Sequence, residues 1–204
     1  MTLDRQSCYE FLLTRRSIRH FRDEPVPEQV MRRILAAASR APSAHNRQPW
    51  RFVVVGRGEA RDQLSREMSS NWRTEQQAEG NMTAELDERI RSRELRMINA
   101  PAAVVLCLTM DEMNVYPDDR RQAAERAMAM QSVALAGGQM LLAAHAEGLG
   151  AFWVSAPLFA PQVVQQSLDL PSDWEPQGMI LLGEPMDPGN DRGRKPLEEV
   201  VLWR

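Results

Sequence analysis

Three arginines and a serine lie close together near the start of the chain, at Arg15, Arg16, Ser17 and Arg19. Guanidinium groups form short, charge-assisted hydrogen bonds with phosphate oxygens, and a serine hydroxyl is a further donor. These residue types therefore favour a site for a phosphate group. The same residues also suit the solvated end of a basic helix, and this segment alone leaves both interpretations open.

A polar segment follows the next predicted helix. Residues 27–41 place apolar side chains at helical spacings, and Pro42 ends the pattern. Residues 42–50 then read PSAHNRQPW, which either offers amide, hydroxyl and backbone groups to a polar ring edge or is an ordinary helix–strand connection. Arg51 to Val55 is apolar and β-branched, so we expect a buried strand there.

The order of these segments resembles the flavin-dependent nitroreductase family. RRSIR and APSAHNRQPWRF are followed by EGLGAFWVS, MILLGEP and RGRKPLEEVV in the family's order, over nearly the whole chain. The resemblance implies an α+β fold with a central, mostly antiparallel sheet flanked by helices. It also implies an intertwined homodimer that exchanges a C-terminal strand, FMN as the cofactor and NAD(P)H as the reductant.

The resemblance assigns flavin contacts to four segments of the chain. Arg15 and Ser17 would face the phosphate and ribityl oxygens, and Arg16 belongs to the same motif. Arg19 would lie at the pyrimidine edge, where a cation stabilises the charge that develops on reduction. The other matching residues are Arg192 and Arg194, which complete the phosphate cage, Pro42, Ser43, Ala44 and Asn46, which come from the other subunit, and Gly148, Leu149 and Gly150, which lie against the ring.

Three segments most resemble the nitroreductase-like domain that ends the bacterial biosynthesis protein of the deazaflavin coenzyme F-420: HNRQPWRF, AGGQMLLAAHAEGLGAFWVS and LPSDWEP. This implies that the substrate is a dehydro-deazaflavin precursor, an anion with a broad aromatic plane. Trp72 would supply a stacking surface, and Arg47 and Arg73 would supply charge. His45 is either a proton donor to the substrate or a loop residue that faces water.

Three other functions compete with this interpretation: a general nitro or quinone reductase, a flavin-fragmenting dimethylbenzimidazole synthase of the same fold, and a non-catalytic flavin-binding protein. The sequence does not distinguish NADH from NADPH or identify the acceptor. It contains no Ser–His–Asp order, phosphate-binding GxxxxGK[ST] loop or zinc-binding pattern. We therefore assign no protein group as the catalytic residue and expect the cofactor to carry the hydride chemistry.

The composition of the chain limits the classes of molecule that it can bind. The 204 residues carry a net charge of −3, which argues against nucleic acid or an anionic membrane surface as a general partner. We find no apolar run of membrane-spanning length and no signal peptide at the start, so we expect a single cytoplasmic domain over residues 1–204. Two cysteines, Cys8 and Cys107, and three scattered histidines argue against a disulfide framework or a metal site.

The rest of the chain alternates helices and strands. Helices are expected at residues 3–13, 120–147 and 161–168, and strands at 101–110, 151–155 and 178–183. The charged residues 59–98 predict a pair of surface helices broken at Gly80, or a mobile flap over the substrate. Gly137 and Gly138 within the longest helix favour the close approach of a ring or of another helix, as at a subunit interface, or are a tolerated weak spot within one monomer. Residues 187–204 form an arm whose end, Leu197 to Trp203, is expected to be a strand.

Overall fold

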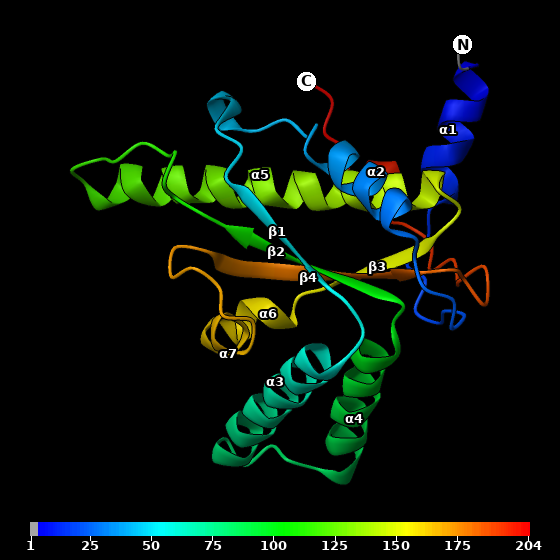
Figure 1. Cartoon of the computed structure of the whole chain (residues 1–204). Helices are drawn as coiled ribbons and strands as arrows, with labels where there is room; N and C mark the ends of the chain where they lie inside the picture. Colours follow the sequence, from blue (N-terminus) through cyan, green and yellow to red (C-terminus); the bar gives the residue numbers. More distant parts are fainter. Residues whose placement is uncertain (1–3) are drawn as a thin grey trace.

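A four-stranded antiparallel sheet forms the centre of the computed structural model, which describes residues 4–204 (Figure 1). The strand order is β1-β2-β4-β3. This confirms the α+β fold with a mostly antiparallel sheet. The strands are β1 (Trp50–Val55), β2 (Ala102–Leu108), β3 (Gly150–Val154) and β4 (Glu175–Gly183).

The central strand β2 contributes to both faces of the sheet because successive side chains of a strand point in opposite directions. Val104, Leu106 and Leu108 enter the cluster on one face, whereas Val105 and Cys107 enter the cluster on the other. Burial also raises the pKa of the Cys107 thiol to about 12. Cys107 is therefore a core residue. Neither Cys107 nor Cys8 forms a disulfide.

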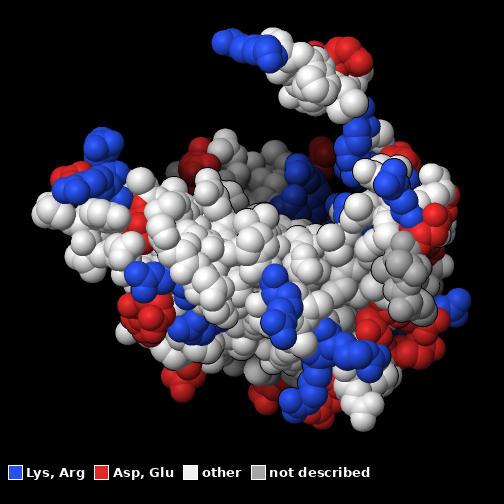
Figure 2. Space-filling model, turned by 90° about the horizontal axis from the view of Figure 1, so that it is seen from above, with Lys and Arg blue, Asp and Glu red and all other residues white. Residues whose placement is uncertain are grey.

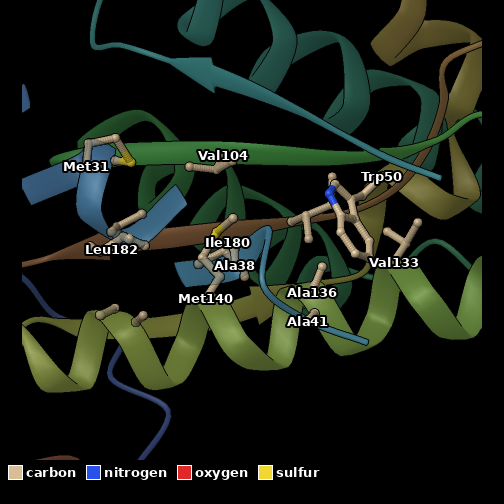
Figure 3. Close-up of a cluster of buried hydrophobic side chains, with 14 of the residues drawn as sticks. Met31, Ala38, Ala41, Trp50, Val104, Val133, Ala136, Met140, Ile180 and Leu182 are labelled. Atoms are coloured by element: carbon tan, nitrogen blue, oxygen red, sulfur yellow. The ribbon is translucent and has the colours of Figure 1, made fainter. Parts of the chain in front are cut away.

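Helices α2 (Glu28–Ala38) and α5 (Asp119–Ala146) cover the first face. Figure 3 shows Met31 and Ala38 of α2 and Met140 of α5 on the side of the cluster near Val104 of β2, whereas Val133 of α5 lies at the other end beside Trp50. Among the described helices, only α5 is long and apolar enough to cross a membrane by length and composition. This corrects our expectation that no segment is long and apolar enough to span a membrane. Helix α5 nevertheless packs on the sheet as a core helix. The cytoplasmic location stays a prediction.

The opposite face carries α3 (Glu59–Ala78), α4 (Ala84–Asn99), α6 (Ala156–Phe159) and α7 (Pro161–Ser167) (Figure 1). Helices α3 and α4 form an antiparallel hairpin that turns at Gly80, whose φ is +71°, which confirms the predicted helix pair. Arg73 joins the two helices through Asp87 at 2.7 Å and Glu94 at 3.5 Å. Movement of this hairpin as a flap stays a prediction.

The ends of the chain differ from expectation in one respect. Helix α1 (Arg5–Thr14) lies close to the predicted position, although Leu3 is outside the described residues. The predicted C-terminal strand does not form in the single chain: Leu197–Val200 is a short helix, α8, and the residues after it are exposed. The exchange of this strand with a partner subunit stays a prediction. A strand needs a neighbouring edge for its backbone groups, and a single chain offers none here, whereas Glu198 and Glu199 favour a helix start.

Candidate active site

The two basic segments that lie at opposite ends of the sequence are neighbours in the structure. Ser17 pairs with Ala151, so residues 14–20 lie along the outer edge of the sheet beside β3. Arg16 Nη2 lies 2.8 Å from Asp191 Oδ2 in the C-terminal loop. His20 Nδ1 lies 3.0 Å from Asp187 Oδ2 in the same loop.

Gly189 lets the two segments approach this closely. A Cβ at this position would lie 2.6 Å from Cδ1 of Ile18, and the φ of Gly189 is +71°. Both the space and the backbone conformation therefore favour glycine. The contact brings Arg192 close enough to Arg19 for its charge to act on it, and Arg16 and Arg194 both act on the carboxylate of Asp191. A phosphate cage formed by these arginines stays a prediction.

Arg19 is the point where this basic cluster meets a pocket. Its guanidinium lies 5.3 Å from the centre of the Phe152 ring. Burial lowers the pKa of Arg19, and the neighbouring charges of Arg192 and Arg96 lower it further. Within residues 4–204 the structure gives Arg19 no carboxylate partner, so its charge is available to an anion.

The pocket has a volume of about 650 Å³ and lies between the α3–α4 hairpin, the end of β3 and α6. Its lining includes Arg19, Trp72, Arg93, Phe152 and Trp153. One end is therefore aromatic and cationic. Glu75 and Glu79 line the end formed by the last turns of α3.

Trp153 explains one of the two helix glycines. A Cβ on Gly137 of α5, or on Gly178 of β4, would lie closer than 3.0 Å to the Trp153 ring. The indole therefore fills the space between the two glycines, and its Nε1 donates to Ser155 Oγ at 3.0 Å. The close approach of an aromatic ring, one of the explanations expected for these glycines, therefore applies to Gly137. Gly138 is exposed and has open space beside it.

Gly148 and Gly150 each have a structural role, and the predicted contact of Gly148, Leu149 and Gly150 with the flavin ring stays a prediction. Gly148 ends α5 with a φ of +75°. Gly150 starts β3, where a Cβ would lie 2.7 Å from Ile18. Residues 152–156, directly downstream, line the pocket.

The loop that contains Pro42, Ser43, Ala44 and Asn46 lies at the other edge of the sheet. It includes the 3₁₀ helix η1 (Ala44–Asn46) and leads into β1, whereas the arginines adjoin β3. Ala44 N donates to Ser132 Oγ of α5 at 3.2 Å, and Gln48 N donates to Ser43 Oγ at 3.1 Å. One chain therefore does not bring this loop to the basic cluster.

This loop is also strained. The φ values of His45, Asn46 and Gln48 are 50°, 54° and 52°, in the left-handed region that non-glycine residues seldom adopt. Backbone strain of this kind collects where a segment is held in place for function.

The predicted substrate residues separate into two places. Trp72 lines the pocket, whereas His45 and Arg47 lie on the loop, with Arg47 Nη2 donating to Asn114 Oδ1 at 3.2 Å. Arg73 does not line the pocket, because its charge is used between α3 and α4. The cations of α4 that line the pocket are Arg93, which lies over Trp72, and Arg96, and our sequence analysis missed both. Their spacing of three on a helix was the signal that both share one face.

No group of metal-ligating side chains forms within residues 4–204. His145 stacks on Phe11, with ring centroids 4.9 Å apart, and its Nε2 lies 3.2 Å from Thr14 Oγ1. This contact joins α5 to α1 and agrees with a structural role for His145.

Comparison with known proteins matches residues 12–184 to a family described as the nitroreductase family. An NADH dehydrogenase from Thermus thermophilus is 35% identical over 218 residues, covering 94% of this chain and 93% of the relative. A 5,6-dimethylbenzimidazole synthase from Rhodospirillum rubrum is 32% identical over 173 residues, covering 85% of this chain and 79% of the relative.

A solved structure shares the fold over the full length of this chain. It is a protein from Desulfovibrio desulfuricans, described as a nitroreductase and determined in complex with FMN. The TM-score is 0.73 at 26% sequence identity, and the match covers 100% of this chain and 98% of the other.

Proposed function

This chain belongs to the nitroreductase family and is an oxidoreductase that works with FMN and NAD(P)H, and we propose that residues of two subunits complete each FMN site. One observation supports the flavin site most directly. Two basic segments that are remote in sequence lie together beside β3, and Arg19 of the first segment lines an aromatic pocket. FMN supplies hydride transfer between the reductant and a planar acceptor. The protein groups bind, orient and shield it.

The residues present fit a phosphorylated ring. Arg15, Ser17, Arg192 and Arg194 offer forked and hydroxyl donors to a phosphate at the joined basic segments. Arg16 is already paired with Asp191, so we assign it to holding the two segments together. Arg19 lies deeper, at the pocket, where its cation stabilises negative charge that develops on the pyrimidine edge of a reduced ring.

A second subunit would bring its own loop at residues 42–46 to the basic cluster of the first. The loop at residues 42–46 and the basic cluster adjoin opposite edges of the sheet, so a two-fold axis can bring one chain's loop to the other chain's cluster. Figure 2 shows a broad face with few charges on the α5 side, where Met130 and Leu135 of α5 are exposed. We assign this face to the homodimer interface, since a large exposed apolar patch favours association.

The narrower proposal for the acceptor is a dehydro-deazaflavin precursor of coenzyme F-420. It is supported by the resemblance of the segments at the pocket, which include residues 152–156, and by the Trp72 stacking surface. The test is a competition among acceptors with pre-reduced enzyme under anaerobic conditions. Reoxidation by the deazaflavin precursor that is no faster than reoxidation by nitrofurazone or menadione would exclude this acceptor.

The R. rubrum relative favours a second candidate, conversion of the flavin to 5,6-dimethylbenzimidazole. The two candidates differ in product. Reduced enzyme exposed to oxygen would release 5,6-dimethylbenzimidazole in the second case, whereas the reductase would return intact oxidised FMN. Chromatography of the small molecules released after one turnover distinguishes them.

The cofactor itself is tested by titration of flavin-free protein with FMN, FAD and riboflavin. We expect FMN to bind most tightly, because only it presents a terminal phosphate to the basic cluster. Steady-state oxidation of NADH and NADPH with a quinone then tests turnover. A protein that takes up no FMN would contradict the proposal.

A further inference from the structure

We propose that Arg93 and Arg96 of α4, together with Trp72 of α3, form an anion-recognition site that selects planar acceptors bearing a carboxylate. This inference rests on the proposed function, because the acceptor must enter the pocket that Arg19 shares with the FMN site. It assigns a role in specificity to two arginines of α4 that neither the sequence nor the similarity to relatives pointed to, beside Trp72, which the sequence already placed at the substrate.

The Trp72 ring and the Arg93 guanidinium place a flat apolar surface directly beside a positive charge. The Arg93 guanidinium lies 4.6 Å from the centre of a Trp72 ring, which is a cation–π arrangement. Both residues line the pocket, and so does Arg96, about one helical turn along α4 from Arg93. Stacking on the indole holds the Arg93 head group in place, so less side-chain freedom is lost when it binds a ligand.

The charges of Arg93 and Arg96 remain uncompensated. In the described part of the chain neither has a carboxylate partner, and Arg96 Nη2 donates only to the Ser92 hydroxyl, at 2.9 Å. Glu94, which lies between them in sequence, is paired with Arg73. Arg89 and Arg96 lie four and three residues from Arg93 along α4, so the three cations share one side of the helix, and burial together with these charges lowers the pKa of Arg93.

Among the described residues, three carboxylates line the pocket beside these arginines. Glu94 is paired with Arg73, and the other two, Glu75 and Glu79, lie on α3 and at its end. Glu75 accepts from Asn71 at 2.9 Å, and Glu79 accepts from Gln76 at 3.1 Å. They lie toward the hairpin turn, beyond Trp72 along α3, whereas Arg96 and Arg19 lie toward the sheet. This polarity favours a ligand that directs its anionic group to Arg93 and Arg96.

A carboxylated aromatic ring satisfies both parts of the site. Its ring gains stacking area on Trp72, and its carboxylate gains charge-assisted hydrogen bonds to the two arginines. A neutral nitroarene gains only the first contribution. The phosphates of NAD(P)H are a second source of negative charge in the same pocket, so the test must separate acceptor from reductant.

The test compares 4-nitrobenzoate with 4-nitrobenzamide as acceptors for the FMN-loaded dimer. The two molecules share ring and nitro group, and they differ in charge. We expect kcat/KM to favour the benzoate by about three- to tenfold, a modest factor because Arg93 reaches solvent. The ratio should fall toward one in Arg93→Gln and Arg96→Gln, and Arg93→Lys should restore part of it.

Arg91→Gln is the matched control, because Arg91 is exposed on the same helix and outside the pocket. Its ratio should equal that of the wild type. Flavin content and quinone turnover of the wild type report separately on the proposed function. An equal preference for both acceptors in active, FMN-loaded wild type would overturn the inference. A changed KM for NADH or NADPH with an unchanged acceptor ratio would also overturn it, by assigning the arginines to the reductant.

Discussion

The indole ring of Trp153 occupies the space that a side chain would need at Gly137. A Cβ built on Gly137 lies closer than 3.0 Å to the ring, and the same holds on its other side at Gly178. Trp153 also lines the pocket. The helix α5 therefore accepts a glycine, at about 1 kcal/mol relative to alanine, so that an aromatic wall of the site can stand between helix and sheet.

We expect Gly137→Ala to lower the free energy of unfolding by about 1–3 kcal/mol, because the added methyl group overpacks against the ring. The measurement is urea unfolding followed by circular dichroism. In a Trp153→Leu background the same alanine should cost nothing or stabilise, since the smaller side chain leaves room. Equal costs in both backgrounds would show that the ring is not the reason for the glycine.

The joined basic segments give a second prediction. Arg15→Ala and Arg194→Ala should each weaken FMN binding by about 1.5–3 kcal/mol, the range for hydrogen bonds to charged groups. Arg32→Ala is the control, because Arg32 pairs only with Glu28 on the exposed side of α2. Fluorescence titration with FMN measures the change. Loss of FMN affinity that is no greater in the two site variants than in the control would remove these arginines from the phosphate cage.

Arg61 gives a third prediction. Its side chain is fully buried, Nη2 donates to Ile98 O at the end of α4 at 3.1 Å, and Nε and Nη1 have no partner. Burial lowers its pKa to about 10, with Arg57 as the next cause. We expect Arg61→Met to leave stability unchanged or to raise it by about 1–4 kcal/mol, since an unpaired buried charge is removed.

The pH dependence follows from the sign of that shift. Burial lowers the pKa of Arg61 to about 10 in the folded state, from the ordinary value of 12.5 in the unfolded chain. The cost of burying the charge is therefore fully present below pH 10 and is lost as the pH rises from 10 toward 12.5. The stability difference between wild type and Arg61→Met should therefore shrink from pH 9 to pH 11. A difference that is independent of pH would contradict this.

Elements with a strong local pattern were predictable from the sequence. The strand at β2 and the helix at α5 agree with expectation within one or two residues, because a buried strand and a long helix carry their periodicity in their own side chains. The break at Gly80 was predictable for the same reason, since glycine readily adopts a positive φ.

Features that depend on residues distant in the sequence could not be predicted from it. Arg93 and Arg96 become pocket residues only because α4 packs beside α3, and Arg73 leaves the pocket because Asp87 and Glu94 meet it across the same hairpin. The C-terminal strand is absent from the single chain because β-branched residues form a strand only where an edge is available to pair with, and its exchange with a partner stays a prediction.

That tail supports the last prediction, which concerns the dimer. Leu197, Leu202 and Trp203 are 67%, 73% and 88% exposed, and Figure 1 shows the tail on the α5 side of the sheet. In a dimer through α5 these side chains would reach the partner, where each Å² of apolar area buried contributes roughly 25 cal/mol. We therefore expect truncation after Pro196 to weaken the dimer and, with it, FMN retention.

Sedimentation velocity at several protein concentrations measures the first effect, and absorbance of retained flavin after gel filtration measures the second. Leu135→Asp, on the exposed face of α5, should act in the same direction because it places a charge in the interface. Leu12→Asp is the control, since Leu12 is similarly exposed but lies on α1. Two-subunit FMN sites require dimer and flavin to be lost together, so a monomeric variant that keeps FMN at wild-type affinity would contradict the shared site.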